Sequence, residues 1–181
     1  EVEMDPNRFL LVLGTGVNGA NNHIPLLDAL YNGGLRNIQI LALCSRNRKL
    51  ADQVKEWART HPEMTVRAKP FIQNMKPLLQ SASALVCRSG TGLTSEAILC
   101  QCPIIFNGMG GFMPQEKITL AYCNRHKLGM SFRKTSELPA IVAEFLRNPD
   151  QLNIARQRKY KIRPHKTPQE LIQHLQSMLR S

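Results

Sequence analysis

The sequence predicts an α/β fold, a Rossmann-like three-layer domain in which a six-stranded parallel sheet lies between two layers of helices. Six short apolar runs alternate with longer segments whose apolar residues have helical spacing. Glycine-rich turns directly follow two of those runs, at residues 14–19 and 89–92. With 43% hydrophobic residues, the chain of 181 residues can bury one substantial core.

The clearest strand is the continuous apolar run at 8–13, because a strand covered on both faces needs no polar side, and five further segments between the predicted helices complete the set of strands. In chain order they are 8–13, 37–44, 64–68, 85–87, 103–107 and 128–132. The helices are predicted from period and end signals, such as the stripe of Leu50, Val54 and Trp57 and the capping residue Asn74. In order they are 23–30, 49–61, 74–79, a helix from 92 or 93 to about 100, 115–126, 136–146, 149–160 and 167–179.

The charge balance predicts an anionic partner, because 24 Lys and Arg face 13 Asp and Glu and the net charge is +11. The basic segment, residues 156–166, holds the densest cluster: Arg156, Arg158, Lys159, Lys161, Arg163 and Lys166. It is either a solvated helix face or a patch that docks on anionic phospholipid head groups, and liposome binding after removal of the charges separates the two. Aromatic residues make up only 6%, so nucleic acid is not an expected partner.

The cysteines and the ends of the chain carry weaker signals. Five scattered cysteines in apolar stretches are typical of reduced thiols in a cytosolic protein, and they lack zinc spacing, so no metal site is expected. The sequence has no signal-peptide pattern and no apolar run of the roughly eighteen residues that a membrane span needs. The first residue is not Met, so we expect a processed product or a piece of a longer chain.

The first glycine-rich turn spans residues 14–19 and matches G-x-G-x-x-G between a strand and a helix. Its glycines permit a tight turn and a close backbone approach to a phosphate. Strand–helix turns are also glycine-rich for packing reasons, and the motif alone does not decide between the two.

The second turn, residues 89–92, has the same strand–turn–helix layout, which directs backbone N–H groups at an anion. Glu96 follows at about the fourth position of the helix. It cannot complete a capping box, because the residue three positions earlier is Leu93. The carboxylate therefore either favours the helix dipole or faces a ligand and accepts hydrogen bonds from a diol.

Five loops that follow strand ends are expected to gather along one edge of the sheet. They are those at Gly14, Ser45–Arg46, Phe71, 89–96 and 108–116. An NAD-binding unit would place an acidic residue at the end of the second strand, where this chain has Ser45–Arg46, so NAD is disfavoured.

In segments 44–50, 70–75, 89–97, 103–105 and 115–116, taken in this order, the chain resembles the C-terminal, donor-binding half of the GT-B-fold glycosyltransferases that use UDP-sugars. It looks most like the diacylglycerol glycosyltransferases, which are monogalactosyl- and glucosyl-diacylglycerol synthases. The muramyl-lipid N-acetylglucosaminyltransferase is a related member.

The resemblance implies a role for each candidate site residue. Arg46, Phe71 and Ile72 would hold the uracil, Glu96 would accept from both ribose hydroxyls, and Gln115 and Glu116 would bind the donor sugar. The diphosphate would be held by Gly14, Thr15, Gly16, Gly19, Ser89, Gly90, Thr91 and Gly92, with no metal.

Other interpretations of these residues remain. Gln115–Glu116 could simply begin a helix, Arg46 could be solvated, Phe71 could be a core residue, and Ser89–Gly90 could be a turn without a ligand. Thr15 also stands where the family often has glycine, and the loop from Gly108 to Pro114 looks longer than usual, which leaves the sugar open.

The resemblance implies a UDP-sugar-binding domain of an inverting, metal-independent glycosyltransferase that transfers a hexose to a lipid acceptor such as diacylglycerol. Residues 1–181 would form one donor-nucleotide-binding domain, with an α/β core over 1–147 and C-terminal helices over 148–181. The acceptor-binding half and its catalytic base would lie outside this chain, and His23, His126 and His165 are not expected to replace that base.

With the UDP-sugar as donor substrate, no cofactor is expected, and the isolated chain should be inactive as a transferase. It would work on the cytoplasmic side of a membrane or, in a plant-like member, at the chloroplast envelope. Two alternatives stay open: a soluble nucleotide-sugar-binding subunit that works with a separate membrane partner, and a UDP-sugar epimerase-type domain.

Overall fold

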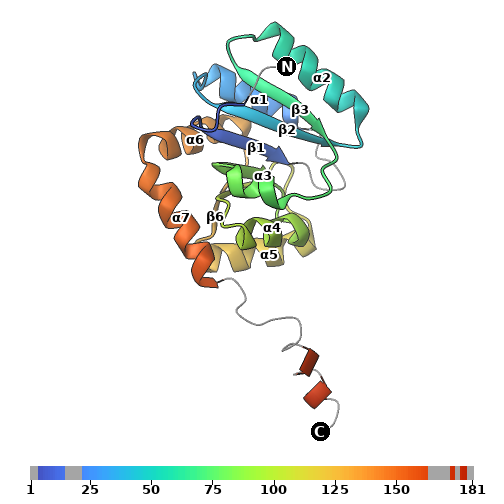
Figure 1. The fold of residues 1–181 in the computed structure, drawn as a ribbon, viewed down its shortest axis with the longest axis vertical. Coiled ribbons are helices and arrows are strands. Elements are labelled where there is room, and N and C mark those ends of the chain that lie inside the picture. The colour runs from blue at the N-terminus through green and yellow to red at the C-terminus, as the bar shows by residue number, and fades with distance from the viewer. Residues whose placement is uncertain (1–3, 15–21, 163–171, 174–175, 179–181) are drawn as a thin grey trace.

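The computed structural model describes residues 4–14, 22–162, 172–173 and 176–178. Its six strands form one sheet with the order β3-β2-β1-β4-β5-β6, and every neighbouring pair is parallel (Figure 1). The strands are β1 (Leu10–Gly14), β2 (Gln39–Ser45), β3 (Thr65–Pro70), β4 (Ala84–Cys87), β5 (Ile104–Asn107) and β6 (Gly129–Phe132). The predicted Rossmann-like six-stranded parallel sheet is therefore confirmed.

The helices fall between the strands or after the last one, as predicted, with differences at their ends. They are α1 (His23–Asn32), α2 (Arg48–Thr60), α3 (Lys76–Ser81), α4 (Thr91–Leu99), α5 (Pro114–Arg125), α6 (Leu138–Arg147) and α7 (Pro149–Ile162). The helix predicted at 136–146 is divided, because Thr135–Glu137 form a separate 3₁₀ turn, η1. Of the helix predicted at 167–179, only residues 172–173 and 176–178 are described.

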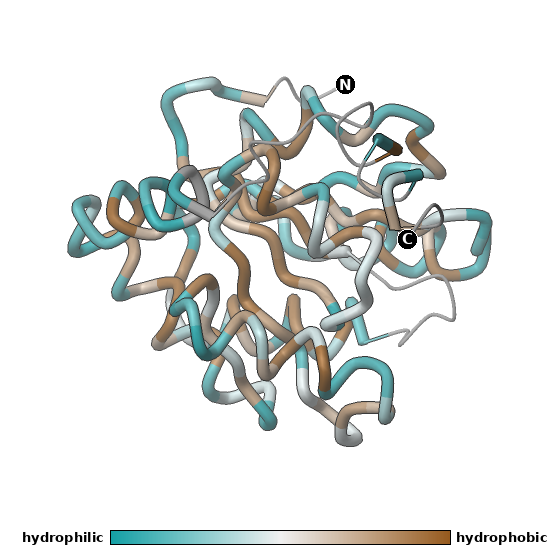
Figure 2. The backbone as a smooth tube through the Cα atoms, turned by 90° about the horizontal axis from the view of Figure 1, so that it is seen from below, coloured by the Kyte–Doolittle hydropathy of each residue, from teal (hydrophilic) through white to brown (hydrophobic). Residues whose placement is uncertain are grey.

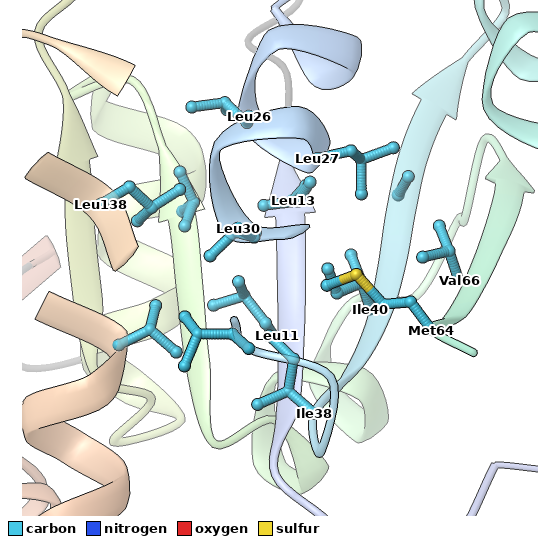
Figure 3. Close-up of a cluster of buried hydrophobic side chains, with 14 of the residues drawn as sticks. Leu11, Leu13, Leu26, Leu27, Leu30, Ile38, Ile40, Met64, Val66 and Leu138 are labelled. Atoms are coloured by element: carbon cyan, nitrogen blue, oxygen red, sulfur yellow. The ribbon is translucent and has the colours of Figure 1, made fainter. Parts of the chain in front are cut away.

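The side chains of β1 show how the sheet is buried on both faces. Leu11 and Leu13 belong to the apolar cluster that includes residues of α1, α2 and α6, whereas Val12 belongs to the cluster that includes residues of α3, α4 and α5. Figure 3 shows Leu27 and Leu30 of α1 close to the β1 leucines. Figure 2 shows apolar colour along the central strands and polar colour at the periphery. Each buried leucine stabilises the fold by about 1.5–3 kcal/mol relative to an exposed one.

Helix α7 lies against α4 and α6. One of its side chains also fastens it to the core, because Arg156 Nη2 donates to the carbonyl of Ala82 at the end of α3, over 2.9 Å. Within the described part of the chain, every helix is too short or too polar to cross a bilayer.

Candidate donor-binding site

The sheet order places a topological switch point between β1 and β4, since the chain leaves this pair toward opposite edges of the sheet. In open parallel sheets a ligand lies beyond the carboxyl ends of the strands at such a point. The strand ends nearest this point are Gly14 on β1 and Cys87 on β4. The loops predicted to form the site leave the sheet along the same edge.

The start of α4 is open to an anion. Gly90 is its N-cap, with φ −68° and ψ 145°, and contributes no side-chain cap, and the first turn contains no acidic residue. The first amide bonded back to Gly90 is that of Thr94, over 3.3 Å. Gly90, Thr91 and Gly92 are exposed. The first turn of a helix leaves its N–H groups without intrahelical partners and carries the positive end of the helix dipole, which suits an anion. The diphosphate contact at these residues stays a prediction.

Gly90 and Gly92 are not required by the packing of the described chain. A Cβ added to either would meet no atom within 4 Å, and neither lies in the left-handed region of φ. A helix interior favours alanine over glycine by about 1 kcal/mol, so the stability of α4 does not explain why position 92 is a glycine. Open space above both glycines is the room that a close backbone contact with a ligand needs.

Glu96 occupies the sixth position of α4, because the helix begins at Thr91, one or two residues earlier than predicted. Its Cα lies about 7.5 Å along the helix axis from that of Thr91, which is too far for a strong interaction with the positive, N-terminal end of the helix dipole. The side chain is exposed and lies one turn below Gly92 on the same face. A ligand that crosses Gly92 along this face reaches Glu96, which favours the diol interpretation over the dipole one.

Ser89 departs from its predicted role. The residue is fully buried, and its Oγ donates to the backbone carbonyl of Glu116 over 3.0 Å. A diphosphate outside the α4 start cannot reach it in this structure, because the residue has no accessible surface. Ser89 instead joins the turn before α4 to helix α5.

The first glycine-rich turn is described only at Gly14, and Thr15, Gly16 and Gly19 lie outside the described residues. A Cβ on Gly14 would lie 3.1 Å from Leu93 Cδ2 and 3.4 Å from Leu85 Cδ1. The packing interpretation therefore accounts for this glycine, which lets α4 approach the end of β1. A diphosphate contact at Gly14 stays a prediction.

The residues predicted to hold uracil come together beyond β2 and β3. The Phe71 N–H donates to the carbonyl of Ser45 over 3.0 Å, and Ser45 has a left-handed φ of 51°. The guanidinium carbon of the exposed Arg46 lies 5.8 Å from the Phe71 ring centroid. Phe71 is 60% exposed, so the alternative that it is a core residue is wrong. Ile72 beside it is half-buried.

Gln115 and Glu116 differ in what they can contact. Gln115 is exposed, whereas Glu116 is only 3% exposed. The Glu116 carboxylate accepts from Arg88 Nε at 3.0 Å and Nη2 at 2.5 Å, and from the Met113 N–H at 2.9 Å. This ion pair lowers the pKa of Glu116. The carboxylate thus caps α5, as in the helix-start alternative, and the geometry argues against its predicted contact with a sugar.

Arg88 is the site residue that sequence reasoning missed. It follows β4 and connects the α4 start to the loop after β5, 108–113, by hydrogen bonds to Met109 and Gly111, and to the start of α5 by hydrogen bonds to Glu116. The one signal in the sequence is its place at a strand end beside the second glycine-rich turn. Its partners lie 21 to 28 residues further along the chain, which no local spacing relates to it.

The basic segment is only partly described. Arg158 and Lys161 of α7 are exposed. Arg156 is half-buried, and one nitrogen of its guanidinium group donates to the carbonyl of Ala82. That nitrogen therefore binds within the protein rather than at a surface. Nothing is described of the Lys159 side chain, and Arg163 and Lys166 lie outside the described residues.

Comparison with known proteins decides the family. Residues 10–107, more than half of the chain, match the model of the glycosyltransferase family 28 C-terminal domain. The chain belongs to this family. It is therefore a donor-binding domain of the GT-B type, and the predicted membership is confirmed.

Relatives of this family 28 domain include a glycolipid synthase. Monogalactosyldiacylglycerol synthase 3, chloroplastic, of Arabidopsis thaliana is 29% identical over 157 residues, which cover 82% of this chain and 32% of the synthase. The UDP-N-acetylglucosamine–N-acetylmuramyl-(pentapeptide) pyrophosphoryl-undecaprenol N-acetylglucosamine transferase of Leuconostoc mesenteroides is 28% identical over 101 residues, 56% of this chain and 27% of that enzyme. The chain thus spans about a third or less of either relative.

The fold is also that of solved glycosyltransferases. The calicheamicin glycosyltransferase CalG4 superposes with a TM-score of 0.69 at 15% identity, over 97% of this chain and 44% of CalG4. At this identity the likeness shows the fold alone.

Proposed function

We propose that this domain binds the UDP-sugar donor of a glycosyltransferase that moves a hexose to a lipid acceptor such as diacylglycerol, with inversion and without a metal. The observation that carries the proposal is the start of α4, where three exposed residues precede the first amide bonded back along the helix, that of Thr94, and Glu96 follows on the face of Gly92. An anion followed by a diol is the chemistry of a nucleoside diphosphate.

Each part of the donor has a candidate partner along the edge of the sheet. The diphosphate would lie on the amides of Gly90, Thr91 and Gly92, the ribose hydroxyls on Glu96, and the uracil beside Phe71 and Arg46. Gln115, exposed at the second position of α5, offers both a donor and an acceptor to sugar hydroxyls. One relative is named for a UDP-sugar and another for a diacylglycerol glycolipid, which supports this choice of donor and acceptor.

In the proposed reaction an acceptor hydroxyl gives its proton to a base and forms a bond to the anomeric carbon from the side opposite the diphosphate, and the bond from that carbon to the diphosphate oxygen breaks. Negative charge then grows on the departing diphosphate. Fixed N–H groups and a helix dipole stabilise such charge without reorganising, and this would be the contribution of the domain to the rate. The acceptor and the base would be held by the other half of the enzyme, with the exposed Arg158 and Lys161 facing anionic lipid.

Titration calorimetry of the chain with UDP and with 2′-deoxy-UDP tests the proposal. Glu96→Ala should raise the Kd for UDP about tenfold, because one or two hydrogen bonds to a charged group are lost. The Kd for the deoxy analogue should change much less. Glu56→Ala is the matched control, because it removes an exposed carboxylate on α2. Absence of UDP binding at millimolar ligand would refute the nucleotide site, and equal losses for both ligands would refute the diol contact.

A further inference from the structure

The Arg88 guanidinium makes four hydrogen bonds within the protein. Nε and Nη2 form a two-point contact with Glu116, Nη1 donates to the Met109 carbonyl at 2.9 Å, and Nη2 also donates to the Gly111 carbonyl at 2.6 Å. The guanidinium carbon lies 5.3 Å from the Phe112 ring centroid. The side chain is 14% exposed. Only the planar fork of arginine can make all these contacts at once.

The loop that Arg88 holds has a defined shape of its own. Gly110 and Gly111 have left-handed φ values of 72° and 84°, which glycine adopts without strain. A Cβ on Gly108 would lie 2.8 Å from the Phe112 ring, so the ring folds tightly back over the loop start. The conformation of the loop therefore fixes where α5 begins, and the hydrogen bonds of Arg88 fix that position relative to β4.

Ser89 adds a second connection between the same two regions. Its hydroxyl donates to the Glu116 carbonyl, while the Glu116 carboxylate receives Arg88. Main chain and side chain of Glu116 are thus both bonded to the two residues that precede Gly90. Gln115 is the neighbour of Glu116, so its position relative to the α4 amides depends on these bonds.

A direct contact of Arg88 with a phosphate explains the geometry less well. Its charge is paired with Glu116 at 2.5 Å, and its hydrogen bonds point into the loop rather than toward Gly90. Removing the arginine would leave the α4 amides in place but free the start of α5.

We propose that Arg88 is a positioning residue that holds the sugar-binding start of α5 in register with the diphosphate-binding start of α4, so that it sets the affinity for the donor's sugar rather than for its nucleotide. This inference rests on the proposed function, since it assumes a nucleotide-sugar at this edge of the sheet.

Calorimetry of the full 181-residue chain with UDP, UDP-glucose and UDP-galactose tests the inference, using Arg88→Lys, Arg88→Ala and Glu116→Gln. The lysine variant keeps the charge but not the fork, and the glutamine variant keeps the shape but not the ion pair. Arg88→Ala lowers the net charge and Glu116→Gln raises it, so a purely electrostatic effect on UDP would have opposite signs in the two. Arg125→Ala, an exposed change on α5, is the control.

All three variants should raise the Kd of whichever UDP-sugar the unaltered chain binds by about tenfold, which corresponds to the loss of one well-placed hydrogen bond. The Kd for UDP should change by less than about threefold. Equal losses for UDP and UDP-sugar, opposite shifts in Arg88→Ala and Glu116→Gln, or no loss in any variant would overturn the inference. If Arg88→Ala does not fold, the lysine and glutamine variants decide. Failure of the unaltered chain to bind UDP would instead overturn the proposed function, and this inference with it.

Discussion

Helices α4 and α5 follow neighbouring strands and begin at the same edge of the sheet, yet their first turns are satisfied in opposite ways. At α4 the cap is a glycine without a side chain, and no acid lies in the first turn. At α5 the cap is Met113, whose N–H donates to the buried Glu116 carboxylate. Both helices carry the same kind of positive end, so an external anion gains most at α4, whose first turn holds no carboxylate to compete with it.

The largest effect on stability is expected from removing the carboxylate that caps the start of α5. Glu116→Ala leaves Arg88 without its carboxylate and the Met113 amide without its cap. Loss of one partner of a buried ion pair costs about 3 kcal/mol or more, and urea unfolding should show a decrease of this size in the free energy of unfolding.

Gln115→Ala, at the exposed neighbouring position, should change stability by less than about 0.5 kcal/mol. Replacing Arg88 with Met in the Glu116→Ala background should recover part of the loss, because it removes the orphaned charge. A double variant less stable than Glu116→Ala would contradict the view that the pair is one unit.

A smaller effect, on UDP binding rather than on stability, is expected from adding a side chain at the start of α4. Gly92→Ala adds a methyl group that meets no atom of the described residues within 4 Å, so thermal unfolding should show unchanged or higher stability, by up to about 1 kcal/mol. The same methyl group occupies the space in front of the open amides, so the Kd for UDP should rise about tenfold.

Ser95→Ala, an exposed change on the same helix, should alter neither quantity. A Gly92→Ala variant that binds UDP as tightly as the unaltered chain would show that the diphosphate does not lie at α4.

The smallest effect should appear as a difference in pH dependence. The Arg88 guanidinium holds the folded-state pKa of Glu116 below its usual value of 4.5. The unfolded chain therefore binds this proton at a higher pH than the folded one, so the stabilisation is complete above the unfolded pKa and is lost as the pH falls through the lowered folded pKa.

Urea unfolding between pH 6 and pH 3.5 should thus show a steeper loss for the unaltered chain than for Glu116→Gln, by at most about 1.4 kcal/mol per pH unit. Parallel curves would mean that the α5 start does not depend on an ionised carboxylate. The α4 start should contribute no such term, because its first turn has no acid.

The central strands could be predicted because both faces of the sheet are covered there, so that β1, β4 and β5 are almost entirely apolar. The edge strand β3 instead carries Arg67 and Lys69. The starts of the helices are less well predicted by the sequence. The extended Gly90 caps α4 without a side-chain signal, so the prediction places the start of the helix too far along the chain and Glu96 too close to that start.

The candidate site could be located from the turns after the strands, but not resolved side chain by side chain. Sequence does not say that Phe71 lies exposed beside Arg46, or that Ser89 and Glu116 bond to each other rather than to a ligand. The role of Arg88 depends on carbonyls that approach it only when the loop after β5 folds back over β4.

The contact between Gly14 and Leu93 couples two loops that a sequence presents as separate. Because a single methyl group at position 14 would press on Leu93 Cδ2 at 3.1 Å, the size of residue 14 sets how far α4 stands from the end of β1. Substitutions at 14 and 93 should therefore be tolerated as pairs rather than singly, with a larger residue at one position accompanied by a smaller one at the other. An engineer who varies the first loop to change the ligand would also move the second, and libraries that randomise both positions together would recover binding that single-position libraries lose.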